Sequence, residues 1–127
     1  MKSLRIYETP KTPDIDFNVD SGVLQISGVS IPEDSVEFYA PVINWLKDYM
    51  KTGPDKNQMV FKLSYINTSS LQFIYELLST IDDNIDQGLD FSIEWHYLSE
   101  DDDMRELGED FKSSIHTKIS LIEVKAV

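Results

Sequence analysis

The sequence predicts an α/β fold, with one domain in which helices pack against a mixed β-sheet. Segments with an apolar side chain at every second position alternate along the chain with segments of helical apolar spacing. An N-terminal hairpin is expected ahead of these units, because two alternating segments flank a short turn. At 127 residues, 41% of them hydrophobic, the chain can form a single domain over residues 1–127 without disulfides.

The first strands are short. Leu4–Tyr7 is typical of a strand, and Thr9–Pro13 interrupts it because each proline removes a backbone donor. Asp14–Val19 and Val23–Gly28 alternate apolar and polar side chains on either side of the turn Asp20–Gly22. We therefore expect these two segments to pair as an antiparallel hairpin.

A first helix is expected between Asp34 and the sequence Thr52–Asp55. Asp34 and Glu37 form a capping pair, and Ser35 is an alternative cap. Pro41 falls within this segment, where a proline costs about 3 kcal/mol in a helix interior but less in the first turns. The apolar side chains that share one helical face are Tyr39, Val42, Ile43, Leu46, Tyr49 and Met50.

At the centre of the chain, Val60–Ser70 predicts a buried strand that is followed directly by a helix. Phe61, Leu63 and Tyr65 recur at every second position, which predicts one apolar strand face. Small polar residues that favour helix N-termini follow this strand. The junction offers free backbone N–H groups and the positive end of a helix dipole, so it suits an anion or an attached phosphate. Its polar residues are Asn67, Thr68, Ser69 and Ser70.

The second half of the chain continues the alternation. Leu71–Ile85 has helical apolar spacing, and Asp86–Gly88 is expected to stop that helix. Leu89–Tyr97 predicts a strand, Glu100–Phe111 a short helix, and Ile119–Val124 a final strand. This order indicates right-handed crossovers and a largely parallel or mixed sheet.

The charge of −12 is unevenly distributed. Residues 82–110 hold 12 acidic residues and one basic residue, whereas the rest of the chain is nearly balanced. Such a surface repels a phosphate backbone, so we expect no nucleic-acid partner. Two interpretations of residues 82–110 stay open, namely a solvated face or a docking surface for a basic partner.

Catalytic and metal-binding patterns are missing from the sequence. The absence of cysteine excludes thiolate sites, and His96 and His116, both expected on strands, have no ligand spacing. Asp101–Asp103 does not open a calcium loop, because Arg105 and Lys112 would occupy ligand positions. No phosphate-binding loop or nucleophile elbow is present either. We therefore expect no catalytic residue, no metal and no cofactor.

The N-terminus, Met1–Arg5, is not followed by an apolar core, and no run approaches about 18 apolar residues. We read no signal peptide and no membrane span. The absence of cysteine suits a reducing compartment, so we expect a cytoplasmic protein.

Three stretches share a pattern with a known family: Gly28–Tyr39 followed by Trp45, then Tyr65–Ser70, and finally Trp95–Tyr97 followed by Glu106–Phe111. Together they resemble the SiaC family of bacterial regulatory phosphoproteins. The resemblance covers roughly residues 12 to 123, and the order and spacing of the motifs make it fairly specific. Asp34 and Gln72 depart from the pattern, which has Asn and Lys at these places.

This resemblance implies a STAS-like fold without catalysis of its own, and a partner-switching circuit in c-di-GMP signalling. A protein kinase would phosphorylate Thr68, a PP2C-type phosphatase would reverse this, and the unmodified form would bind an effector such as a diguanylate cyclase. Tyr65, Asn67, Ser69 and Ser70 would be the motif residues around the phosphorylation site.

We therefore expect Thr68 to act as an off switch for partner binding. One alternative is a module that binds a small anion at the same helix start, with Thr68 unmodified. A second alternative is a small hydrolase that uses two of the 23 carboxylates, although no spacing singles out a pair.

Overall fold

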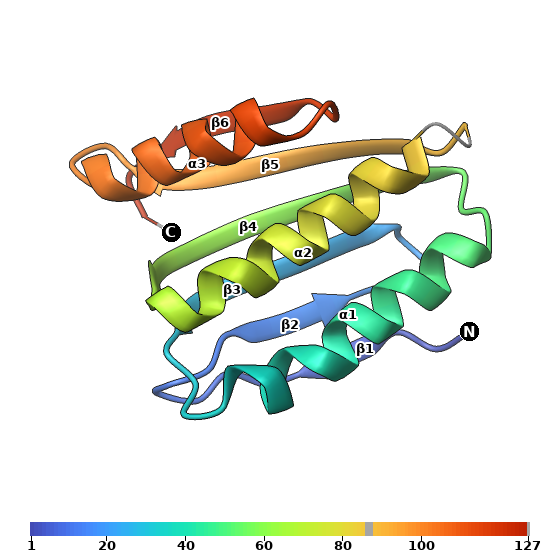
Figure 1. Cartoon of the computed structure of the whole chain (residues 1–127), viewed down its shortest axis with the longest axis horizontal. Coiled ribbons are helices and arrows are strands. Elements are labelled where there is room, and N and C mark those ends of the chain that lie inside the picture. Colours follow the sequence, from blue (N-terminus) through green and yellow to red (C-terminus); the bar gives the residue numbers. More distant parts are fainter. Residues whose placement is uncertain (86–87, 127) are drawn as a thin grey trace.

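In residues 1–85 and 88–126, which the computed structural model describes, six strands form one mixed sheet (Figure 1). The spatial order follows the chain, β1-β2-β3-β4-β5-β6. β2 runs antiparallel to β1 and β3, and the remaining neighbours are parallel, which confirms the hairpin and the mixed sheet. The strands are β1 (Leu4–Ile6), β2 (Asp14–Phe17), β3 (Val23–Ser30), β4 (Lys56–Ile66), β5 (Asp90–Leu98) and β6 (Ile119–Val124).

Within the described residues, each parallel step of the sheet is bridged by one helix. These are α1 (Ser35–Lys51), α2 (Thr68–Ile85) and α3 (Asp102–Ser114). Every crossover advances the sheet in the same direction, so right-handed connections place the helices on one face. Figure 1 views the molecule from that helix side, with α1 over the N-terminal strands and α3 over β5 and β6.

The core lies between this sheet face and the helices. The apolar face that the sequence predicts for α1 is buried along its whole length, and the buried apolar residues of α2 are Phe73, Ile74, Leu77, Leu78 and Ile81. Burying a large apolar side chain contributes about 1.5–3 kcal/mol, so this layer supplies most of the driving force for folding. Its fully buried members include Ile15, Leu24, Ile26, Met59, Phe61, Leu63, Ile93 and Trp95 from the sheet.

The start of α1 resolves the choice between two caps. The Asp34 carboxylate accepts a hydrogen bond of 3.0 Å from the Glu37 N–H, so Asp34 and not Ser35 is the N-cap. Pro41 lies inside the helix on its exposed side. A carbonyl that loses its helical donor there can bond to water, which explains why α1 continues past the proline.

A β-bulge changes the direction of the last residues of β4. Leu63 pairs with Gly28, but Tyr65 pairs with Val29, so Ser64 is an extra residue on β4. One extra residue reverses the alternation of faces along a strand. The Tyr65 side chain is 58% exposed, and the expectation that it shares the buried face of the strand is therefore wrong.

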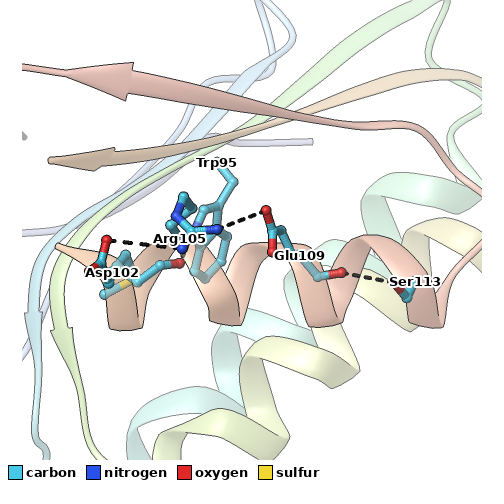
Figure 2. A network of polar contacts seen from close by, with 6 residues as sticks. Trp95, Asp102, Arg105, Glu109 and Ser113 are labelled. Atoms are coloured by element: carbon cyan, nitrogen blue, oxygen red, sulfur yellow. Dashed lines mark hydrogen bonds and ion pairs between the residues drawn. The ribbon is translucent and has the colours of Figure 1, made fainter. Parts of the chain in front are cut away.

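The close packing of α3 on β5 depends on a glycine. A Cβ atom on Gly108 would lie 2.5 Å from Cδ1 of Trp95. The Trp95 indole N–H donates to the carbonyl of Met104 at 2.9 Å, and the Phe111 ring lies 5.5 Å from the indole. Figure 2 shows Trp95 against this helix, with the ion pair of Arg105 and Glu109 on the same helix.

Several expected boundaries differ from the structure. β4 begins at Lys56, before the expected Val60, and His116 lies in the connection between α3 and β6, so placing it on a strand was wrong. Residues 86–87 of the expected helix stop lie outside the described residues, while Gly88 has φ +84 and its N–H donates to Ile85. In the described part of the chain, no helix has the length and hydropathy needed to cross a bilayer.

Candidate functional site

The start of α2 lies at the edge of the sheet where the carboxyl ends of β3, β4, β5 and β6 meet. Because these strands are parallel and β3, β4 and β5 each lead into the next helix, α1, α2 and α3 begin at this edge, on the left in Figure 1. Binding sites of α/β proteins concentrate at such edges, since loops and helix N-termini converge there. The polar residues Asn67–Ser70 therefore lie at the edge of the sheet where a binding site is most expected.

Asn67 is the N-cap of α2. Its side-chain oxygen accepts a hydrogen bond of 3.0 Å from the backbone N–H of Ser70, and its own N–H donates to the carbonyl of Ser30 at 2.9 Å. The Ser69 hydroxyl donates to the same amide oxygen at 3.3 Å. Ser69 and Ser70 thus hold the cap in place, while Asn67 itself satisfies the helix start.

A line of buried hydroxyls anchors this cap to the core. The Ser30 hydroxyl lies 2.5 Å from that of Tyr39 and donates to that of Ser70 at 2.9 Å, and Ser70 in turn donates to the Asn67 oxygen at 2.5 Å. Ser30, Tyr39 and Ser70 are fully buried. Burial raises the pKa of the Tyr39 phenol, although its hydrogen bond to Ser30 opposes this, so the phenol stays protonated.

Sequence reasoning did not foresee this network. Ser30 occupies an inward-facing position of β3, as Leu24 and Ile26 do, and a polar residue on an apolar strand face is a signal that could have indicated it.

A second contact joins the starts of α1 and α2. The hydroxyls of Ser35 and Ser69 lie 2.6 Å apart. Asn67, Ser69 and Ser70 are therefore all committed to hydrogen bonds that build the site. Thr68, the first residue of α2, is exposed, and no residue in the described ranges hydrogen-bonds to its hydroxyl.

The acidic stretch 82–110 is divided between two ends of the molecule. Asp82, near the end of α2, accepts hydrogen bonds from the backbone N–H groups of His116 and Thr117 at 3.0 and 2.8 Å. Asp101 and Asp103, at the start of α3, lie instead at the edge that carries Thr68. These acids therefore do not form one continuous docking surface.

A small cavity, which we call the β4–α3 hollow, lies between the end of β4 and the first turns of α3, next to the start of α2 that carries Thr68. Its volume is about 220 Å³, and apolar side chains line it together with two carboxylates. The lining residues include Tyr65, Ile66, Asp101, Asp103, Met104 and Leu107. The hollow lies on the β5 side of the end of β4, because β4 and β5 pair only as far as Phe61 and Trp95, and α3 borders β4 on that side beyond this point.

The described residues contain no group of three or more His, Asp or Glu side chains that could hold a metal ion. His96 bonds to Glu94 at 2.9 Å in β5, whereas His116 lies 3.5 Å from Asp82 near the end of α2. The two histidines thus serve separate local contacts.

Comparisons with known proteins agree with this architecture. The model of the SiaC family of regulatory phosphoproteins matches residues 6–124. An uncharacterised protein of Pseudomonas aeruginosa strain UCBPP-PA14 is 31% identical over 112 residues, which are 88% of this chain and 89% of that protein.

Solved structures of SiaC proteins also resemble this chain. SiaC of Pseudomonas aeruginosa is 28% identical and superposes with a TM-score of 0.90 over 98% of this chain and 100% of its own. A chain in the crystal structure of the diguanylate cyclase SiaD with its activator SiaC, from the same species, is 28% identical. It superposes with a TM-score of 0.91 over 95% of this chain and 99% of its own.

Proposed function

The chain belongs to the SiaC family of regulatory phosphoproteins, and we propose that it is a non-enzymatic signalling regulator that binds a diguanylate cyclase. Phosphorylation of Thr68 by a protein kinase switches this binding off, and a PP2C-type phosphatase restores it. The circuit thereby couples the phosphorylation state of one threonine to the synthesis of c-di-GMP.

The state of the four polar residues at the start of α2 supports Thr68 as the modified residue. Ser70 is fully buried, and Asn67 caps the helix. The hydroxyl of Ser69 is hydrogen-bonded to the hydroxyl of Ser35, with 2.6 Å between the two oxygen atoms. A kinase needs an accessible hydroxyl that is free to attack the phosphorus atom, and the exposed Thr68 side chain meets this need. This is the observation that carries the proposal.

A phosphate on Thr68 is compatible with the fold. It adds a charge of about −1.5 to −2 at the first residue of α2. The positive end of the helix dipole favours such a charge by about 0.3–1 kcal/mol. The cap and the buried hydroxyls lie beneath Thr68, so the modification changes the surface rather than the structure of the helix.

Partner release follows from the position of this charge. The matched SiaC chain in the SiaD complex has this fold, and its partner there, a diguanylate cyclase, supports a cyclase as the partner of this chain. If the cyclase covers the edge around Thr68, the phosphate must give up its water or be expelled from the contact. Either outcome weakens the complex sharply.

Cyclase activity tests this function. Unmodified chain should raise the rate of c-di-GMP formation by purified SiaD, whereas chain with phosphothreonine installed at position 68 should not. Phosphothreonine at position 52 controls for the added charge, because Thr52 lies at the C-terminal end of α1, away from the edge where α1 and α2 begin. Thr68→Ala should activate the cyclase constitutively, and equal activation by the two phosphorylated forms would overturn the proposal.

A further inference from the structure

We propose that the β4–α3 hollow is the docking site for a segment of the diguanylate cyclase that carries an apolar side chain beside basic ones. This inference rests on the proposed function and specifies the chemistry of the partner. It is carried by the outward turn of Tyr65, by the size of the hollow, and by the charge of its rim.

The bulge at Ser64 turns Tyr65 outwards, and this exposed aromatic residue is one of those that line the hollow. Bulges commonly re-aim a side chain next to a functional site. Tyr65 is 58% exposed, whereas Tyr39 and Tyr49 lie in the core. An exposed tyrosine beside a cavity is typical of the anchor residues that dominate protein–protein binding.

The size of the hollow favours a side chain of a partner over a free ligand. Its volume is about 220 Å³, below the range of about 300–1,000 Å³ that is usual for small-molecule pockets. Ile66, Met104 and Leu107 give it an apolar lining. A methionine in such a lining adapts readily to an incoming aliphatic or aromatic group.

The rim of the hollow is negative. The Asp101 carboxylate caps α3 through a 3.1 Å hydrogen bond from the Met104 N–H, so it is already engaged. Asp103 is exposed and forms no ion pair with another described residue. The nearby cation, Arg105, is held by Glu109 at 3.0 Å and lies 4.0 Å from Asp102 (Figure 2). Asp103 is therefore available to a basic group of the partner.

The apolar centre of the hollow also explains why a negative phosphate on Thr68 can weaken the binding of a partner that carries basic groups. Thr68 follows the lining residue Ile66 by two positions, so its phosphate lies next to the docked segment. An ion pair at an exposed rim contributes little, because water screens it. Burying a phosphate against an apolar segment costs much more, and the net effect of the modification is release.

Binding of purified SiaD of Pseudomonas aeruginosa to immobilised chain tests this docking site. Tyr65→Ser should weaken the affinity by at least about tenfold, mainly through faster dissociation. The matched control is Tyr7→Ser. Tyr7 is an exposed tyrosine that directly follows the edge strand β1, and its ring stacks on Arg5. This control should leave the affinity unchanged.

A charge reversal tests the rim separately. Asp103→Lys should slow association by about fivefold at low salt, and the effect should vanish at high salt because the charges are screened. Asp83→Lys changes the net charge equally at the opposite end of α2 and should not slow association to this extent.

The outcomes separate this inference from the proposed function. If unmodified chain binds SiaD and neither Tyr65→Ser nor Asp103→Lys weakens the complex, the docking site is wrong and the function stands. If unmodified chain does not bind SiaD, both fall. If Tyr65→Ser instead abolishes a dimer of this chain, the hollow is occupied by a second copy, which also overturns the docking site.

Discussion

The hydroxyl of Ser30 donates to the hydroxyl of Ser70 across 2.9 Å, although 40 residues separate the two in the chain. This contact links the end of β3 to the first turn of α2, beneath Thr68. Both side chains are fully buried. The start of α2, which carries Thr68, is therefore anchored to the core.

Ser70→Ala tests the buried hydroxyl line. The substitution removes the acceptor of the Ser30 hydroxyl and should lower the free energy of unfolding by about 1–3 kcal/mol, the cost of an unsatisfied buried donor. Urea unfolding measures this. Ser113→Ala removes an exposed hydroxyl on α3 and should change the stability by less than about 0.5 kcal/mol. Equal losses for the two variants would contradict the stabilising role of the network.

Asn67→Ala tests the cap of α2. It removes the oxygen that receives the Ser70 N–H and should lower the free energy of unfolding by about 1 kcal/mol. Asn67→Asp keeps an acceptor at this place and should retain most of the stability. If thermal unfolding shows the aspartate variant to be as unstable as the alanine variant, capping is not the role of this residue.

Gly108→Ala tests the packing of α3 on Trp95. Alanine favours a helix by up to about 1 kcal/mol, but its Cβ would lie 2.5 Å from the indole and 2.7 Å from Leu121. Overpacking should dominate and lower the free energy of unfolding by about 1–3 kcal/mol. A changed tryptophan emission spectrum should accompany the loss. Glu106→Ala, on an exposed position of α3, is the control, and a stabilised Gly108→Ala protein would contradict the packing.

The pH dependence of stability tests the contact of Asp82, near the end of α2, with the connection between α3 and β6. Burial alone would raise the pKa of Asp82, but hydrogen bonds from Thr117 and His116 outweigh it and leave the pKa below the ordinary value of 3.8. A lowered folded pKa stabilises the protein fully above 3.8, and this contribution is lost as the pH falls through the folded pKa.

Asp82→Asn should therefore be less stable than the parent at neutral pH, and the difference should shrink below the ordinary pKa of 3.8. Unfolding by urea across the acid range measures this difference. Asp83→Asn, the exposed neighbour, should show no comparable dependence. A constant difference at all pH values would contradict the assignment to Asp82.

Local patterns were sufficient to predict most of the fold. The alternation in Asp14–Val19 and Val23–Gly28 predicts the two strands of the hairpin. Gly22 predicts the turn between them, because glycine readily adopts a positive φ, which is +73 in the structure. Asp34 and Glu37 predict the start of α1 for an equally local reason, since a cap depends on residues close in sequence.

The features missed by sequence reasoning depend on distant residues. The exposure of Tyr65 follows from a register shift against β3, which its own alternation with Phe61 and Leu63 does not reveal. The contact of Ser30 with Ser70 and the β4–α3 hollow likewise need the sheet order. Sequence could thus point to the polar junction but not to the surface that surrounds Thr68.

Calorimetric titration of SiaD with unmodified chain and with chain phosphorylated at Thr68 measures whether the phosphate releases the partner. The phosphate should weaken the affinity by at least about 30-fold, equivalent to about 2 kcal/mol, while the far-ultraviolet circular dichroism of the chain stays unchanged. Equal affinity of the two forms would contradict the account of Thr68 as an off switch.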